Sequence, residues 1–174
     1  MKALKTIGTI LIMIVLLFFI TAMFLPRETY FEESRVIRTD PVTAYSAVND
    51  LHNWEKWSPW IEMDPKVKIY YIGSGQGQGA GYHWDGPVTG KGKLTILKSN
   101  PYKNVHFSLE FSGQGTSEGG FNFEGVPGGT RVSWYMEMHN LKYPFQRWIG
   151  IFMPPMMRKD FRHGLDNMQR VLMN

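Results

Sequence analysis

The sequence predicts an α+β protein, in which a mostly antiparallel sheet of about six to seven strands packs against one long C-terminal helix and one transmembrane helix comes first. Three observations support this prediction. An unbroken apolar run lies near the N-terminus, apolar and polar residues alternate in short segments along the middle of the chain, and apolar residues recur at helical spacing from Pro154 onward. A single long helix beside such a sheet should bury its apolar stripe against that sheet.

The composition excludes several classes of protein. The chain has no cysteine, which excludes a disulfide framework, cysteine catalysis and thiolate metal sites. Lys2 and Lys5 account for two of its 19 basic residues, so 17 basic residues oppose 15 acidic residues from Pro26 onward. A scattered excess of about two charges does not predict a nucleic-acid groove, and we expect no nucleic-acid partner.

The apolar run Ile7–Leu25 predicts a membrane span. As a helix it would rise about 28 Å, close to the thickness of the hydrocarbon core. Lys2 and Lys5 precede it, so the positive-inside rule favours a single-pass protein with a cytoplasmic N-terminus and an extracytoplasmic domain. A cleaved signal peptide is the alternative, but the run is long for one and no small-x-small site stands at its end. We therefore divide the chain into a membrane anchor, residues 1–27, and a folded domain, residues 28–174.

A strand and a short helix should open the domain. The strand is predicted at Tyr30–Thr39 and the helix at Val42–Asn49. Between them, Asp40 suits an N-cap and Pro41 suits the first helical position, where its missing N–H costs nothing.

A tryptophan-rich stretch follows, Leu51–Trp60, with the sequence LHNWEKWSPW. Trp54 and Trp57 share a face if this stretch is a helical turn, and Ser58-Pro59 should end it. We expect Trp57 and Trp60 to be largely buried, closing one end of the sheet.

The remaining middle of the chain has the character of a β-meander. Strands are predicted at Lys68–Ile72, Tyr82–Asp85, Val88–Lys98, Val105–Phe111, around Phe121 and Phe123, and at Thr130–Met138, the last being the longest. Turns are predicted at Gly73–Gly81, Gly86-Pro87, Asn100–Tyr102, Gly113–Gly115 and Pro127–Gly129.

The final helix should begin at Pro154-Pro155, since proline suits a first turn, with Leu141–Met153 as a helical lead-in. Gly164 lies inside this helix, where it either lets a strand approach closely or leaves room for a ligand. The apolar stripe consists of Met157, Phe161, Leu165, Met168 and Leu172.

The order of these elements and several motifs resemble the START-like superfamily, in particular its polyketide cyclase/dehydrase branch, often labelled SRPBCC. The motifs are Asp40-Pro41, WEKWSPW, Asp64-Pro65, GSGQGQGAGYHWDGPVTGKGKLTI, GGTRVSW and FRHGLDNMQ. The resemblance covers about Thr29 to Asn174. It implies a helix-grip fold, in which the sheet curls around the C-terminal helix and a cavity lies between them. It carries over no catalytic residues, because the superfamily has no universal catalytic set.

Other chemical motifs are weak. The glycine-rich stretch Gly73–Gly79 has no Lys-Ser/Thr partner for a P-loop and does not run into a helix, so we interpret it as a hairpin. His83 and Asp85 could form an acid–base pair on one face of a strand, but two polar residues on a solvent face are the better interpretation. The histidines stand singly, at His52, His83, His106, His139 and His163, so we expect no metal and no cofactor.

We therefore expect a membrane-anchored module that binds a hydrophobic or amphipathic small molecule, such as a lipid, between the sheet and the last helix. Two alternatives stay open: a cyclase, dehydrase or hydrolytic enzyme acting in the same cavity, and an interaction scaffold without a ligand. We lean away from an enzyme. The residues expected to line the cavity are Trp57, Trp84, Phe107, Trp134, Met136, Met157, Phe161, Leu165 and Met168.

Overall fold

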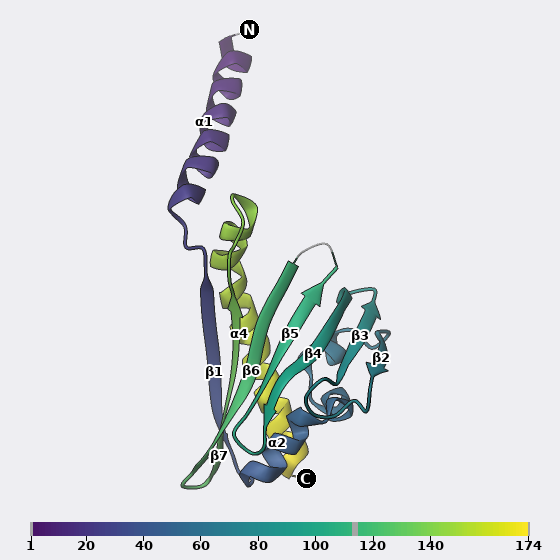
Figure 1. Cartoon of the computed structure of the whole chain (residues 1–174). Coiled ribbons are helices and arrows are strands. Elements are labelled where there is room, and N and C mark those ends of the chain that lie inside the picture. Colours follow the sequence, from purple (N-terminus) through teal and green to yellow (C-terminus); the bar gives the residue numbers. More distant parts are fainter. Residues whose placement is uncertain (1, 113–114, 174) are drawn as a thin grey trace.

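The computed structural model describes residues 2–112 and 115–173 (Figure 1). The helices are α1 (Lys2–Phe24), α2 (Pro41–Asn49), the 3₁₀ helix η1 (Leu51–Lys56), α3 (Pro59–Met63) and α4 (Phe145–Met173). The strands are β1 (Thr29–Ile37), β2 (Lys68–Ile72), β3 (Gly81–Gly86), β4 (Gly90–Asn100), β5 (Asn104–Phe111), β6 (Gly115–Val126) and β7 (Gly129–Met138).

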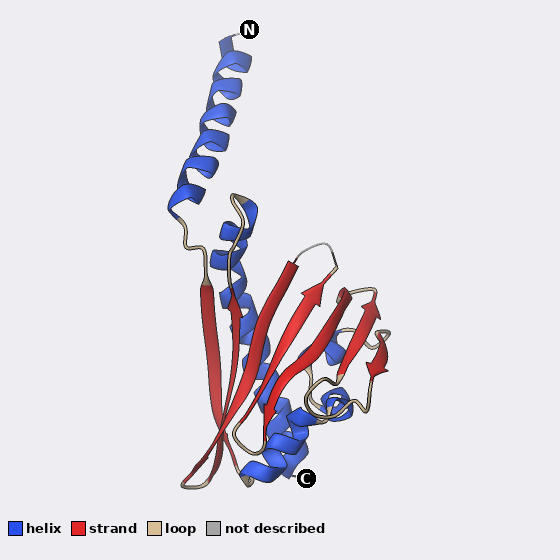
Figure 2. Ribbon diagram, viewed as in Figure 1, coloured by secondary structure: helices blue, strands red, loops and turns tan. Residues whose placement is uncertain are grey.

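The seven strands form one antiparallel sheet in the order β1-β7-β6-β5-β4-β3-β2. Strands β2 to β7 follow one another as a meander, and only β1 reaches across to pair with β7. Helix α4 runs along one face of the sheet (Figure 2). This architecture confirms the predicted fold class.

Helix α1 projects away from the domain (Figure 1). Within the part of the chain that the structure describes, it is the one helix long and apolar enough to cross a membrane, judged by length and composition. Nearly all of its side chains are exposed. An exposed apolar helix of this length is what a membrane span requires.

The start of the last helix differs from the prediction. Helix α4 begins at Phe145, so Pro154 and Pro155 lie in its interior. Proline inside a helix removes backbone hydrogen bonds, which is why the sequence favoured a start at the prolines. The helix extends further because the turns before the prolines have a packing partner, the end of α1, which local sequence does not reveal.

Two other helix ends agree with the prediction. The Asp40 side chain caps α2, accepting hydrogen bonds from the backbone N–H groups of Val42 at 2.9 Å and Thr43 at 3.0 Å. The 3₁₀ helix η1 ends at Lys56, just before Ser58-Pro59 as predicted, and Pro59 then begins the next helix, α3. Proline is compatible with both roles, because it is tolerated at the first helical position.

Strand lengths and turns also differ in detail. Strand β6, with 12 residues, is longer than β7, with 10 residues, so the prediction of the longest strand was wrong. Four glycines in β6 weakened its alternating pattern. The turn predicted at Gly113–Gly115 lies partly outside the described residues, since 113 and 114 are not described, and Gly115 already belongs to β6.

The glycine-rich stretch forms a loop that packs on the start of η1. Gly75 and Gly77 both have positive φ, which favours glycine. The Gly75 carbonyl accepts a hydrogen bond of 2.9 Å from the Leu51 N–H, and the Gly77 N–H donates one of 3.1 Å to the Asn49 carbonyl. The loop therefore fastens the sheet to the helices beside it.

An aromatic cluster fills the centre of the domain. Trp54 and Trp57 are buried, and their indole N–H groups donate hydrogen bonds to the carbonyls of Val48 and Ala47, respectively. Trp57 is only 2% exposed, as expected, whereas Trp60 is half-buried. Burying rings of this size supplies much of the apolar free energy of a small domain.

Candidate functional site

An apolar pocket of about 310 Å³ lies to one side of the aromatic cluster. Its walls come from α3, the strands β2, β3, β5 and β7, the turn between β3 and β4, and helix α4. We call it the apolar pocket. Its lining consists of Ser58, Trp60, Ile61, Met63, Val67, Ile69, Tyr82, Trp84, Val88, Thr89, Leu109, Phe111, Met136, Met156, Met157 and Asp160.

Local sequence positions these walls. Ser58-Pro59 starts α3, which carries Trp60 and Ile61 to the pocket. In β5 the alternation of the strand turns Leu109 and Phe111 to the same face, toward the pocket. Apolar residues from a short helix and from several strands therefore converge on one volume.

Asp64 holds the rim of the pocket in place. It is 1% exposed, and its Oδ2 accepts hydrogen bonds from the Val88 N–H, the Thr89 N–H and the Thr89 hydroxyl, each at 2.9 Å. Burial alone would raise the pKa of Asp64, but the hydrogen bonds from Thr89 and Val88 outweigh it and lower that pKa. The charged carboxylate therefore ties the β3–β4 turn to the end of α3.

Three of the nine residues predicted to line a cavity do line this pocket: Trp84, Met136 and Met157. The other six lie in the filled core beside it and are buried there. They are Trp57, Phe107, Trp134, Phe161, Leu165 and Met168.

Stacked rings fill the space that the sequence assigned to a cavity. The ring of Trp134 lies between Phe161, at a centroid distance of 4.2 Å, and Phe121, at 4.8 Å. Close-packed rings leave no room for a ligand there. Helical and strand spacing identified the facing surfaces but could not reveal where they touch.

Most of the pocket lining was not predicted from the sequence. The alternation of Phe107, Leu109 and Phe111 was visible, but only Phe107 was selected, and it lies deeper. The other apolar residues missed are Trp60, Ile61, Met63, Val67, Ile69, Tyr82, Val88 and Met156. Most of these come from α3 and the outer strands β2 and β3. Their positions relative to α4 depend on the tertiary fold.

The polar groups of the pocket are few. Among the described lining residues, Asp160 is the one carboxylate, and none is a histidine, lysine or arginine. Ser58, Thr89 and Tyr82 contribute hydroxyl groups. Burial raises the pKa of Tyr82, so its phenol stays neutral at physiological pH. The pocket can therefore accommodate a ligand with a large apolar part and a small polar group. Its described lining offers no pair of acid and base.

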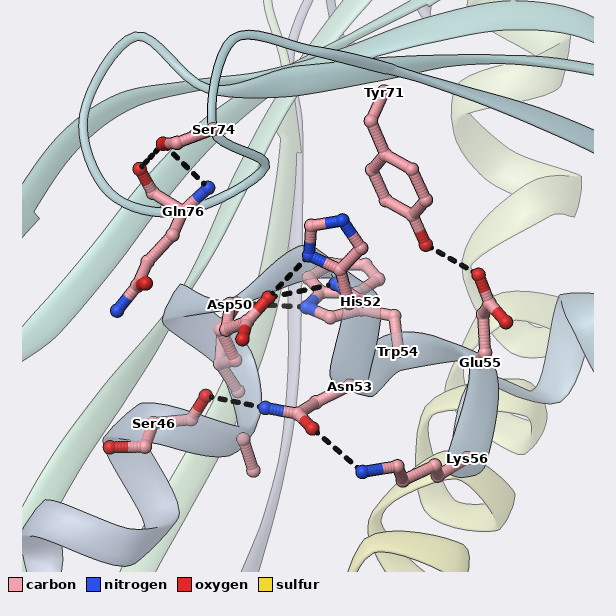
Figure 3. Close-up of polar contacts among 12 residues, drawn as sticks. Ser46, Asp50, His52, Asn53, Trp54, Glu55, Lys56, Tyr71, Ser74 and Gln76 are labelled. Atoms are coloured by element: carbon pink, nitrogen blue, oxygen red, sulfur yellow. Dashed lines mark hydrogen bonds and ion pairs between the residues drawn. The ribbon is translucent and has the colours of Figure 1, made fainter.

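A polar cluster lies beside the glycine-rich loop, outside the apolar pocket (Figure 3). The Nδ1 atom of His52 lies 2.8 Å from Asp50 Oδ1, and the Tyr71 hydroxyl donates a hydrogen bond of 2.6 Å to Glu55. The rings of His52 and Tyr71 pack 4.0 Å apart. Burial and the hydrogen bond to Glu55 raise the pKa of Tyr71. These contacts join η1 to β2, which is a structural role.

A second cluster lies on the outer face of the sheet. One ligand atom each from His106, Glu118 and Glu137 lies within 4.8 Å of the others, a set that could hold a metal ion. His106 already contacts Glu118 at 2.8 Å and the Tyr135 hydroxyl at 3.0 Å. Burial raises the pKa of Tyr135, and Glu137 and Glu118 add to this effect. The three residues come from three strands, so sequence spacing could not reveal the set.

The pair His83 and Asp85 also lies on the outer face of the sheet. Asp85 forms an ion pair of 2.7 Å with Lys91, and His83 is exposed. Neither residue lines the apolar pocket. The structure therefore agrees with the interpretation of two polar residues on a solvent face.

A family model described as "Polyketide cyclase / dehydrase and lipid transport" matches residues 28–173. The chain belongs to this family. Membership in the polyketide cyclase/dehydrase and lipid transport family indicates a ligand-binding module of the SRPBCC type. No curated protein matches the chain.

Solved structures share the fold of this family member at low sequence identity. Protein CV1439 from Chromobacterium violaceum is 15% identical, with a TM-score of 0.61 over 83% of this chain and 97% of its own. Protein SA2116 from Staphylococcus aureus, described as of unknown function, is 14% identical, with a TM-score of 0.62 over 83% of this chain and 93% of its own. The Aha1 dimer from Colwellia psychrerythraea is 16% identical, with a TM-score of 0.59 over 83% of this chain and 96% of its own.

Proposed function

We propose that this protein is a membrane-anchored module that binds a hydrophobic or amphipathic small molecule, lipids included, in the apolar pocket. The observation that carries the proposal is the pocket itself, about 310 Å³ in volume and lined almost wholly by apolar side chains. Ligand sites are typically concave, mostly apolar and provided with a few polar groups that orient the ligand. The family description, which includes lipid transport, supports the same conclusion.

The volume of the pocket limits the ligand. A dry engineered cavity of about 150 Å³ binds benzene, so a pocket of about 310 Å³ suits a ligand of roughly twice that size. Two fused or linked rings, or a section of an acyl chain, meet this limit. A larger lipid would place only part of its apolar chain in the pocket and leave the rest outside.

The pocket chemistry favours binding over catalysis. General acid–base catalysis requires titratable groups within hydrogen-bond reach of the reacting atoms. Asp160 is the single carboxylate among the described lining residues, and no histidine lies there to pair with it. An empty apolar cavity next to a packed core lowers the stability of a domain. The pocket is therefore better explained by a ligand than by a scaffold that binds none.

The proposal also includes the anchor. We propose that α1 spans a membrane and holds the domain on the extracytoplasmic side. The length and apolar character of α1 support the span, and the positions of Lys2 and Lys5 support the orientation.

Probe binding tests the pocket. Residues 28–174 correspond to nearly the whole of the solved neighbours, so this segment can be produced without α1 for the experiment. We expect 1-anilinonaphthalene-8-sulfonate to bind it at micromolar concentration with an increase in emission. Met157→Trp should fill the pocket and weaken binding at least tenfold. Met173→Trp, the same substitution in the same helix but outside the pocket lining, should leave binding unchanged.

The same preparations give a second measurement. Native mass spectrometry should detect a co-purified apolar ligand on the unsubstituted domain and less of it on Met157→Trp. Absence of both probe binding and co-purified ligand, with circular dichroism showing a folded domain, would exclude the binding function.

A further inference from the structure

The N-terminal turns of α4 carry an exposed apolar surface. Phe145 is 66% exposed, Phe152 is 63% exposed and Met156 is 70% exposed. With Trp148 and Ile149 these residues recur at spacings of three and four, so they form one stripe along α4. We call the set Phe145, Trp148, Ile149, Phe152 and Met156 the α4 stripe. Large apolar side chains exposed together usually mark a contact with a partner or a membrane.

The α4 stripe is continuous with α1. Trp148 stacks on Phe18 at a centroid distance of 5.3 Å, and Phe145 packs on the same ring at 5.8 Å. The Trp148 indole N–H donates to the Phe18 carbonyl at 3.4 Å. The Arg147 guanidinium donates hydrogen bonds of 3.0 Å to the carbonyls of Ala22 and Met23, at the C-terminal end of α1.

These contacts set the depth of the α4 stripe. Phe18 lies inside the apolar run of α1, and the helix rises about 9 Å between Phe18 and its last residue, Phe24. If α1 spans a membrane, the residues that contact Phe18 lie about 9 Å deeper in the bilayer than the end of α1. That depth lies inside the hydrocarbon core, where the apolar rings of Phe145 and Trp148 are favoured and the Trp148 N–H is satisfied by the Phe18 carbonyl.

We infer that the α4 stripe is embedded in the surface of the bilayer that α1 spans and that it presents the apolar pocket to the lipid phase. This inference rests on the proposed function. Met156 belongs both to the α4 stripe and to the pocket lining. It lies about 12 Å along α4 from Trp148, which brings it close to the end of the apolar run of α1. Figure 1 shows α4 leading from the end of α1 into the domain.

The class of ligand follows from this placement. A ligand that enters past Met156 comes from the bilayer without crossing water, so its apolar part is never exposed. The ligand is therefore an amphipathic molecule resident in the membrane, such as a lipid, rather than a molecule dissolved in water. The apolar pocket holds its chain, while the polar end stays near the headgroups.

Single cysteines test the placement in the full chain, because the natural sequence has no cysteine. An environment-sensitive nitrobenzoxadiazole label is attached to Phe152→Cys in the α4 stripe, Ile14→Cys in α1, or Val36→Cys at the far end of β1. Each labelled protein is reconstituted in phosphatidylcholine vesicles. Emission is then quenched either by a spin-labelled lipid or by iodide in the water.

We expect the lipid quencher to act on labels at Ile14 and Phe152 and iodide to act on the label at Val36. An Ile14 label in lipid with a Phe152 label open to iodide would overturn the inference and leave the anchor intact. An Ile14 label open to iodide would overturn both. A Phe152 label shielded from both quenchers would mean that protein covers the α4 stripe, which also contradicts the inference.

The pocket is tested separately, so that its failure is not confused with that of the α4 stripe. Phe145→Glu and Phe152→Glu combined place two charges on the α4 stripe, and neither residue lines the pocket. Binding of 1-anilinonaphthalene-8-sulfonate by residues 28–174 should be unchanged by these substitutions. Transfer of a fluorescent phospholipid from vesicles to the full chain should fall at least fivefold. Equal transfer by both proteins would refute entry from the bilayer.

Discussion

The indole ring of Trp134 and the phenyl ring of Phe161 are stacked almost in parallel, with 4.2 Å between their centroids and 3° between their planes. Trp134 comes from β7 and Phe161 from α4, and neither side chain is exposed. This pair joins the last helix to β7, the strand next to the edge strand β1. It therefore divides the interior into a filled core and the apolar pocket beside it.

Removing the Phe161 ring should destabilise the domain. Phe161→Ala deletes a fully buried ring that contacts both Trp134 and Phe31, so we expect a loss of about 3–5 kcal/mol in the free energy of unfolding. Urea unfolding of residues 28–174, followed by circular dichroism, measures this loss. Lys159→Ala, on an exposed face of the same helix, should change stability by less than about 0.5 kcal/mol. A loss below about 1 kcal/mol for Phe161→Ala would contradict the packing described for the core.

Gly164 should resist replacement even though alanine is the better helix former. A Cβ atom there would lie 2.7 Å from Trp134 Cζ3 and 3.0 Å from Pro59 Cδ, both parts of rigid rings. Overpacking typically costs about 1–3 kcal/mol, against a helix-propensity gain of about 1 kcal/mol. We expect Gly164→Ala to lower the melting temperature. Gly150→Ala is the matched control in α4, because its Cβ would meet the flexible tip of Leu141, and it should lower the melting temperature less. The reverse order would show that α4 can move away from Trp134.

Asp64 should make stability depend on pH on the acid side. Its pKa is lower in the folded state than in the unfolded chain, because burial is outweighed by hydrogen bonds from Thr89 and Val88. The stabilisation is therefore fully present above the unfolded pKa, about 4, and is lost as the pH falls through the folded value. Asp64→Asn keeps the shape but removes the charge. The difference in unfolding free energy between the two proteins should be largest near pH 7 and shrink below about pH 4. A difference that does not vary with pH would exclude a role for the charge.

Arg147 should fix the angle between α1 and the domain. Its guanidinium is buried and satisfies two carbonyls at the end of α1, where cations are favoured. Arg147→Met removes these hydrogen bonds and should widen the range of angles between α1 and the folded domain. Spin labels on Ile20→Cys and Ile151→Cys report the angle, and the distribution of distances between them should broaden in Arg147→Met. Arg162→Met, also on α4 but bonded to Glu33, should leave the distribution unchanged. Equal distributions in all three proteins would mean that the aromatic contacts alone hold α1.

The orientation in the membrane can be tested with a fusion. A reporter enzyme active only outside the cytoplasm, fused to the C-terminus, should be active because Lys2 and Lys5 precede the span. Replacing both lysines by glutamate should reduce this activity. Activity from a reporter that works only in the cytoplasm would reverse the proposed orientation.

The sequence by itself determined the fold class, since each of its signals is local. Alternation in Val105–Phe111 predicts a strand, Asp40-Pro41 predicts a helix start, and the stripe through Phe161 and Leu165 predicts a face buried against the sheet. The apolar character of α1 is equally local. Each of these patterns is confined to a few helical turns or to one strand. They can therefore be recognised without knowing which elements pack against them.

Only the tertiary structure decided where the interior is full and where it is hollow. Trp134 and Phe161 fill the space between β7 and α4, and Gly164 lets α4 pack closely against the Trp134 ring. The pocket lies among α3, the outer strands β2 and β3, and helix α4, so Ile61 and Ile69 line it although neither belongs to the predicted stripe. Spacing along a chain specifies which face of an element is apolar, but the distance between two such faces depends on the volumes of all the side chains between them.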